Sequence, residues 1–261
     1  MIHIILRTCY KSLLTLPKPR ICGNNRGEMI LKCLHSLIVS CNYSKLDLKL
    51  TVLDDHSDNE FVGKITHKLS MSKFPYEFIS LKESGFNNSA YEQFYLAAQH
   101  NDLVYTVEDD YLHTEDAILE MYNTYHHFKK EISTFKEVAI HPYNCPDRYD
   151  LGKEFPCRLY YYNNRYWRTN NHTSNTIFTQ GNVFRKYFDL FKILALRYGK
   201  DPLIVEDTTI NKLWNNNVTA NGIVLLISPI PSVATHLSYE TPTQITYAMN
   251  DWREQWNNIE L

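Results

Sequence analysis

Residues 105–113 read YTVEDDYLH, and this stretch decides how the first half of the chain is interpreted. Aromatic and β-branched residues indicate a buried strand, and the strand ends in three consecutive acids, Glu108, Asp109 and Asp110. Like charges at this spacing repel, and an ionised carboxylate is costly to remove from water. The acids therefore either occupy a solvated turn or belong beside a positive group, most simply a divalent cation.

Strands and helices alternate on both sides of this stretch. Strands are predicted at residues 2–7, 48–55, 76–82 and 102–110. Apolar residues at helical spacing predict helices at residues 26–41, 59–69, 89–101 and 114–132, the third with Ser89 as its N-cap. Such alternation is typical of right-handed βαβ units in a mostly parallel sheet.

Polar residues follow each of the four predicted strands. They are Arg7 and Thr8, Asp54 and Asp55, the turn from Gly85 to Asn88, and the acids Glu108 to Asp110. The carboxyl ends of parallel strands meet at one edge of a sheet, where ligands bind. We therefore expect these four groups to face one crevice.

The second half of the chain has a different pattern. Residues 138–182 read as strands and loops, followed by helices at 183–199 and 205–216 and a last strand with its exit at 222–237. The aromatic segment YYYNNRYW at 160–167 either stacks on sugar rings or forms core. No repeat or low-complexity linker divides the chain, so we predict a single domain over residues 1–261.

Composition excludes several classes of protein. The chain has 261 residues, 44% of them hydrophobic and 21% charged, and a net charge of −2, which argues against a general nucleic-acid binder. Its 6 cysteines form no CxxC and no zinc spacing, so we expect reduced thiols and a cytoplasmic setting. No run approaches the ~18 apolar residues of a membrane span. We expect a soluble protein without a transmembrane segment, and leave peripheral membrane attachment open.

Phosphate-binding motifs rich in glycine are absent. Neither GxxxxGK[ST] nor GxGxxG occurs, which argues against a P-loop NTPase and a classical dinucleotide dehydrogenase. Carboxylates with a neighbouring histidine suit Mg²⁺ or Mn²⁺, and such a metal would neutralise a bound diphosphate.

Four segments together resemble glycosyltransferases of the GT-A fold, particularly family 2. They are VLDDHSD (52–58), the stretch from Glu83 to His113 that ends in EDDYLH, VEDTTINKLW (205–214) and PSVATHL (231–237). The EDD form also resembles that of GT-A N-acetylglucosaminyltransferases. The resemblance implies an α/β, Rossmann-like nucleotide-diphospho-sugar transferase fold with a mostly parallel central sheet flanked by helices. Residues 1–113 would be the nucleotide-sugar-binding half, and 114–261 the acceptor-binding and catalytic-base half.

The resemblance also implies roles for residues on the donor side. Asp54 or Asp55 would contact the base or ribose of the nucleotide, in a pocket also lined by Arg7, Thr8 and the turn at Gly85. Glu108 and Asp109 would face the ribose and the donor sugar.

Metal binding and base catalysis are assigned by the same resemblance. Asp110 would bind the Mn²⁺ or Mg²⁺ that bridges the diphosphate, and His236 would be a second ligand. Asp207, or Glu206 beside it, would be the general base that deprotonates an acceptor hydroxyl.

These roles describe a metal-dependent inverting glycosyltransferase. It would move a sugar from a nucleotide-sugar donor, with a UDP-hexose or UDP-N-acetylhexosamine favoured, to a hydroxyl of a glycan or glycoconjugate, as in polysaccharide biosynthesis. The alternatives are a sugar-1-phosphate nucleotidyltransferase and a non-catalytic protein that binds nucleotides or glycans. Oligomerisation is left open.

Each candidate residue also has a purely structural interpretation. Glu108 to Asp110 could form a solvated turn, and Asp54 and Asp55 an Asx-turn. Glu206 and Asp207 could cap a helix. His236 could be an ordinary histidine after a strand.

Overall fold

A nine-stranded sheet lies at the centre of the part of the chain that the computed structural model describes, which is residues 1–11, 25–131, 137–144, 157–173, 175–197, 208–214, 223–237 and 251–261. In chain order, the strands of this sheet and of a separate two-stranded ribbon are β1 (Ile2–Thr8), β2 (Leu48–Asp54), β3 (Tyr76–Ser80), β4 (Leu103–Glu108), β5 (Tyr111–His113), β6 (Glu137–Ile140), β7 (Leu159–Tyr162), β8 (Arg165–Thr169), β9 (Ile177–Gln180), β10 (Val224–Ile230) and β11 (Ala234–His236). The order in the sheet is β3-β2-β1-β4-β9-β6-β10-β8-β7, and β5 pairs with β11 in a separate two-stranded ribbon.

The sheet is mostly parallel, as predicted. The strands β1, β2, β3 and β4 are parallel neighbours, and β6 and β10 run parallel to each other. The strands β9 and β8 run against their neighbours. The α/β fold class with a mostly parallel central sheet is therefore confirmed, whereas the division into a nucleotide half and an acceptor half stays a prediction.

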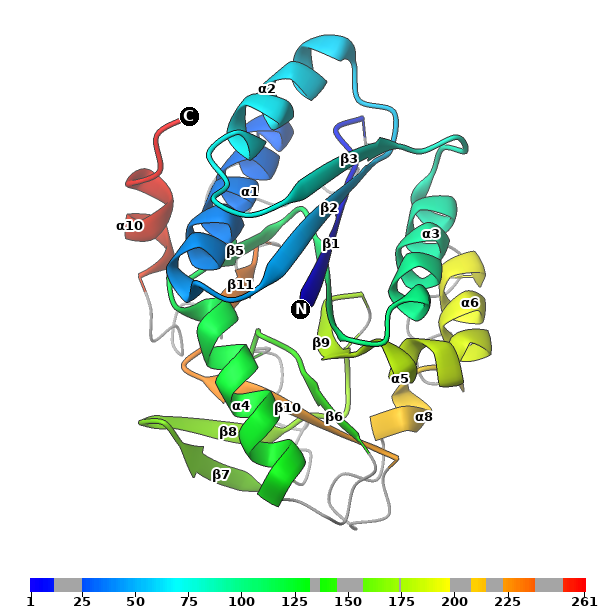
Figure 1. The fold of residues 1–261 in the computed structure, drawn as a ribbon, viewed down its shortest axis with the longest axis vertical. Helices are drawn as coiled ribbons and strands as arrows, with labels where there is room; N and C mark the ends of the chain where they lie inside the picture. Colours follow the sequence, from blue (N-terminus) through cyan, green and yellow to red (C-terminus); the bar gives the residue numbers. More distant parts are fainter. Residues whose placement is uncertain are drawn as a thin grey trace.

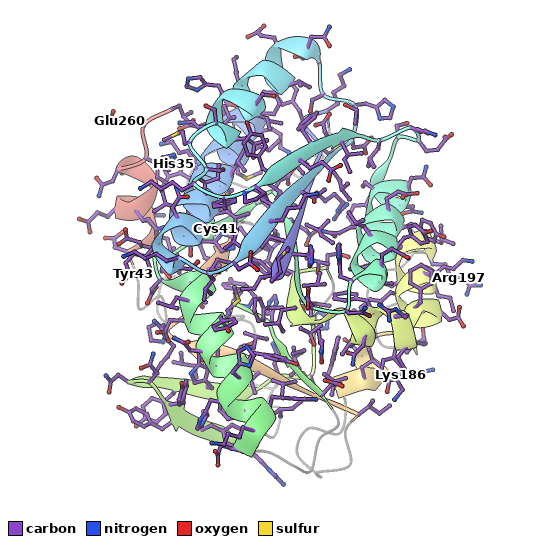
Figure 2. All side chains as sticks on the ribbon, viewed as in Figure 1. His35, Cys41, Tyr43, Lys186, Arg197 and Glu260 are labelled. Atoms are coloured by element: carbon purple, nitrogen blue, oxygen red, sulfur yellow. The ribbon has the colours of Figure 1, made fainter. Side chains whose placement is uncertain are left out.

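Helices cover both faces of the sheet (Figure 1). Their bounds are α1 (Arg26–Ser44), α2 (Asn59–Leu69), α3 (Phe86–Gln99), α4 (Ala117–Glu131), α5 (Gly181–Lys186), α6 (Phe188–Arg197), α8 (Asn211–Trp214) and α10 (Trp252–Asn257). One apolar cluster joins the sheet to α1, α2 and α4, and another joins it to α3, α5, α6 and α8. Figure 2 shows His35 and Cys41 on α1, and Lys186 and Arg197 on the far side, on α5 and α6.

Strand β1 shows why this sheet needs helices on both faces. Ile2, Ile4 and Leu6 belong to the cluster under α1, α2 and α4, whereas Ile5 belongs to the cluster under α3. Successive side chains of a strand point to opposite faces, so a continuous apolar run must be covered twice. The result is a doubly wound sheet. Because helices cover both of its faces, polar ligands are expected to bind at the carboxyl ends of β1 to β4.

Three local predictions need correction or extension. The helix predicted at 183–199 is two helices, α5 and α6, and α5 begins at Gly181. Helix α3 begins at Phe86 with Gly85 as its N-cap, not at Ser89. Gly85 has a φ of 103°, a conformation open to glycine and strained for other residues. The last strand is two strands, β10 and β11, and the second of them leaves the large sheet to pair with β5.

Helix α10 packs against α1 (Figure 1). Trp252 and Trp256 belong to one apolar cluster with Met29 and Cys33, and the Lys32 ammonium donates to the carbonyl of Trp256 at 2.9 Å. Among the helices of the described residues, not one is long and apolar enough to cross a membrane.

His113 is a buried titratable group at the end of β5. Its Nε2 lies 2.8 Å from the hydroxyl of Tyr105, and its backbone N–H donates to Ser36 Oγ. Burial lowers the pKa of His113 to about 3, whereas a histidine in an unfolded chain titrates near ~6.5. Between these two values the unfolded chain binds a proton that the folded chain does not, so acid destabilises the fold.

We expect His113 alone to reduce the free energy of unfolding by about 1.4 kcal/mol per pH unit as the pH falls from roughly 6.5 towards 3. The variant His113→Gln lacks this titration. Urea denaturation of both proteins near neutral pH and near about pH 5 should show the advantage of the wild type shrinking with acid. A difference between the two proteins that is independent of pH would contradict the assignment.

Candidate functional site

A cavity of about 630 Å³ opens at the carboxyl ends of β1, β2 and β4. Its size suits a small-molecule ligand such as a nucleotide. It is lined by Arg7, Cys9, Lys11, Arg26, Asp55, His56, Ser84, Gly85, Phe86, Ser89, Glu108, Asp109 and Asp110. The predicted crevice is therefore present, and residues that follow β1, β2, β3 and β4 all contribute to it.

The three consecutive carboxylates of residues 108–110 each have a different positive or protonatable partner. Glu108 Oε1 lies 2.6 Å from Arg7 Nη2. Asp109 pairs with Arg26, whose Nη2 lies 2.6 Å from each carboxylate oxygen. Asp110 Oδ2 lies 3.1 Å from Nε2 of His236. The electrostatic repulsion expected among three adjacent carboxylates is thus offset by partners from β1, α1 and β11.

Arg26 was missed by the sequence reasoning. It is the first residue of α1, and its Nε donates to the carbonyl of Cys9 at 3.1 Å, while the backbone N–H of Cys9 donates to Asp109 Oδ2 at 2.8 Å. A cation in the first turn of a helix opposes the helix dipole, which favours acids there. That anomaly was the available signal for Arg26.

Burial and the arginines act on the acids in opposite senses. Burial raises the pKa of Asp109, while the Arg26 guanidinium favours its charged form. Burial likewise raises the pKa of Glu108, and Arg7 opposes this change. Although burial disfavours its charge, the carboxylates of Asp109 and Asp110 raise the pKa of Arg26. The site thus favours the charged form of Arg26, and the ionisation of Glu108 and Asp109 depends on the neighbouring arginines.

Arg7 lines the cavity, as expected, and is held in place from three directions. Its guanidinium contacts Glu108, donates to Ser89 Oγ at 3.3 Å and lies over the ring of Phe86 at 4.3 Å. Glu108 also accepts from the side-chain amide of Asn175 at 3.2 Å. Arg7 and Glu108 therefore form part of the cavity wall as an ion pair.

Thr8 and Asp54 do not line the cavity. Both are buried, and Thr8 Oγ1 donates to Asp54 Oδ1 at 3.0 Å. Asp54 also accepts from the backbone and hydroxyl of Ser57. This pattern is the Asx-type turn that the sequence left open. Asp54 therefore stabilises the end of β2, and the neighbouring Asp55 is the acid that lines the cavity.

Asp110 and His236 are brought together by the ribbon of β5 and β11. His236 lies opposite Tyr111 in this ribbon, their rings stack with centroids 5.1 Å apart, and the backbone N–H of Leu237 donates to the Asp110 carbonyl at 2.8 Å. Within the described residues, no group of three or more His, Cys, Asp and Glu side chains is placed to hold a metal ion. The predicted pair is adjacent, and metal binding by it stays a prediction.

The other predicted site residues divide between the cavity and the rest of the chain. Gly85 lines the cavity and donates its backbone N–H to Asp55 Oδ2 at 2.9 Å. Glu206 and Asp207 lie outside the described residues. Arg165 and Arg185 donate to backbone carbonyl groups and do not line the cavity. The basic residues at the cavity are instead Arg7, Lys11 and Arg26.

Comparison with known proteins yields similarity in structure alone. No family model matches the chain, and no curated protein matches its sequence. A nucleotide-diphospho-sugar transferase structure from Desulfovibrio desulfuricans is similar at 11% identity and a TM-score of 0.47, over 87% of this chain and 79% of that one. The galactosyltransferase LgtC, solved with donor and acceptor sugar analogs, is similar at 10% identity and a TM-score of 0.47, over 99% and 84%.

Staphylococcus aureus TarS is also similar. Its 1–349 fragment in complex with UDP matches at 13% identity and a TM-score of 0.44, over 75% of this chain and 54% of that one. In another TarS structure the match, at a TM-score of 0.36, covers 53% of this chain and 20% of the TarS chain. Identities of 10–13% and TM-scores below 0.5 assign neither a family nor a reaction to this chain.

The Arg26–Asp109 pair provides a test of the site's electrostatics. We expect Arg26→Met to lower the free energy of unfolding by about 3–5 kcal/mol, because it leaves a buried carboxylate without its cation. The double variant Arg26→Met/Asp109→Asn should recover part of this loss. Urea denaturation measures both effects.

The matched control is Lys64→Met, which breaks the exposed pair of Lys64 with Glu60 on α2. Exposed pairs contribute little, so this variant should unfold like the wild type. An Arg26→Met protein as stable as Lys64→Met would contradict the buried ion pair.

Proposed function

We propose that this protein transfers a sugar from a nucleoside-diphosphate donor to a hydroxyl group of a glycan or glycoconjugate, with Mn²⁺ or Mg²⁺ bound. The observation that carries the proposal is the division of the three acids at the end of β4. Arginines pair with Glu108 and Asp109, whereas Asp110 pairs with His236, whose imidazole can be neutral. Asp110 also lines the nucleotide-sized cavity. Asp110 is thus the acid whose partner can join it in binding a cation.

The donor set of Asp110 and His236 fits such a metal. Both cations bind carboxylate oxygen, and Mn²⁺, the softer of the two, also takes imidazole nitrogen; such metals are commonly held by one or two protein carboxylates, with phosphate oxygens and water completing the shell. A pair of protein ligands is therefore sufficient when the substrate is a diphosphate. When bound, the metal would stabilise the negative charge that develops on the departing nucleoside diphosphate.

The cavity residues support a diphosphate donor. The cavity lining includes four carboxylates, and the three basic side chains of Arg7, Arg26 and Lys11 offset most of the negative charge that a phosphate would meet. Arg26 and Arg7 are held by ion pairs and therefore act as fixed positive groups in the wall. A UDP-hexose or a UDP-N-acetylhexosamine remains the favoured donor.

Support for the acceptor side comes from sequence alone. Asp207 is proposed as the general base, with Glu206 as its neighbour, at the start of the segment VEDTTINKLW. An alcohol is a weak nucleophile, so a carboxylate must take its proton as the oxygen attacks the anomeric carbon. The new glycosidic bond forms as the bond from that carbon to the diphosphate oxygen breaks, which inverts the configuration.

Removal of the metal ligand provides the first test. Titration calorimetry of the wild type with UDP should show binding with Mn²⁺ that weakens at least about tenfold in EDTA. Asp110→Asn should bind UDP equally weakly in both conditions. The control, Asp102→Asn, changes an exposed acid that precedes β4 at the other end of the sheet, and should retain the metal dependence. Metal-dependent binding by Asp110→Asn that matched the wild type would exclude Asp110 as a ligand.

The general base can be tested separately from donor binding. Asp207→Asn should reduce turnover by roughly 10²–10⁴-fold without changing the affinity for UDP, because the base acts on the acceptor. Glu206→Gln serves as the matched control and should lose much less activity. The assay measures release of UDP from UDP-sugars, and pyrophosphate is measured in parallel. Release of pyrophosphate instead of UDP would identify a nucleotidyltransferase and overturn the proposed reaction.

A further inference from the structure

Asp55 and His56 form a carboxylate–imidazole unit in the cavity wall. Asp55 is 3% exposed in its side chain, and His56 is 43% exposed, with its Nδ1 3.0 Å from Asp55 Oδ1. Asp55 also accepts the backbone N–H of Gly85 at the start of α3. Both residues line the cavity, but the oxygens of the buried acid already accept hydrogen bonds from protein groups, and His56 is the more exposed of the two.

The backbone of His56 has a conformation that glycine shares. Its φ is 59°, in the left-handed region, where asparagine, aspartate and histidine are the commonest residues after glycine. Glycine would adopt this turn without strain, so the ring can be removed there without straining the backbone. The hydrogen bond to Asp55 then fixes the direction of the ring.

The unit lies at the end of the cavity away from the proposed metal. Asp110 follows β4, and His56 follows β2, with β1 between these strands. Neighbouring strands are about 4.8 Å apart, so the two positions are separated by roughly 10 Å across the sheet edge. This separation suits a nucleoside diphosphate whose phosphates lie at Asp110 and whose base lies near His56 and Phe86.

Chemistry then determines what His56 can recognise. An ionised carboxylate only accepts hydrogen bonds, so Nδ1 of His56 donates to Asp55. In the neutral ring the other nitrogen, Nε2, is consequently an acceptor. Its complement on a nucleobase is a ring N–H, which uracil carries at N3. This inference rests on the proposed function, because it requires a nucleotide in the cavity.

We propose that His56, positioned by Asp55, is the specificity residue for the donor base and accepts a hydrogen bond from N3–H of uracil. The test compares UDP with its N3-methyl derivative, which lacks this proton, by titration calorimetry with Mn²⁺. The wild type should prefer UDP by about tenfold or more, since the methyl group leaves Nε2 without its donor.

Two variants separate recognition from folding. His56→Gly removes the ring and relieves the backbone strain, so thermal denaturation should show a protein at least as stable as the wild type. Its preference for UDP over N3-methyl-UDP should fall to about threefold or less. His56→Gln retains an acceptor at the end of its side chain and should recover most of the preference.

Failure of this inference and failure of the proposed function give different results. If the wild type binds both ligands equally with Mn²⁺, or if His56→Gly keeps the full preference, the role of His56 is overturned and the nucleotide site stands. If the wild type binds neither ligand with Mn²⁺, both the nucleotide site and the role of His56 are overturned.

Discussion

The site depends on how three adjacent carboxylates at the end of one strand are balanced by charge. Removing them from water would be unfavourable without partners, and each acid has one. The partners differ in kind. Two are guanidinium groups, which stay charged, and the third is an imidazole, which can be neutral and bind a cation. Neighbours in the chain thereby acquire different chemistry through their surroundings.

This balance requires the fold around it. Arg7 arrives on β1, which pairs with β4 in parallel and places Arg7 opposite Glu108 in the register. Arg26 arrives at the first turn of α1, and the backbone of Cys9 links it to the same carboxylate. His236 arrives through β11, which leaves the large sheet to pair with β5. The ribbon of β5 and β11 is thus the structural reason that Asp110 differs from the two acids before it.

The carboxyl edge of the sheet carries two different pairs of an acid and a histidine. Asp110 pairs with His236 after β4, and Asp55 pairs with His56 after β2. The strand order β2-β1-β4 sets the distance between these pairs. The proposed nucleoside diphosphate, which is charged at one end and flat at the other, would span both pairs. The two acids thus differ in their surroundings: Asp110 is partly buried beside His236, whereas Asp55 is buried and supports the imidazole of His56.

The sequence by itself determined the alternation of strands and helices, the mostly parallel sheet and the crevice at its carboxyl edge, because apolar periodicity and strand ends are local properties. Only the tertiary structure decided which polar residues face that crevice. The sequence does not distinguish the roles of Asp54 and Asp55, and both are buried. In the structure, Asp54 bonds to Thr8 and Ser57, whereas Asp55 supports His56. Arg26 joined the site for the same reason: its contact with Asp109 spans 83 positions of the chain, and no local pattern encodes a pairing at that separation.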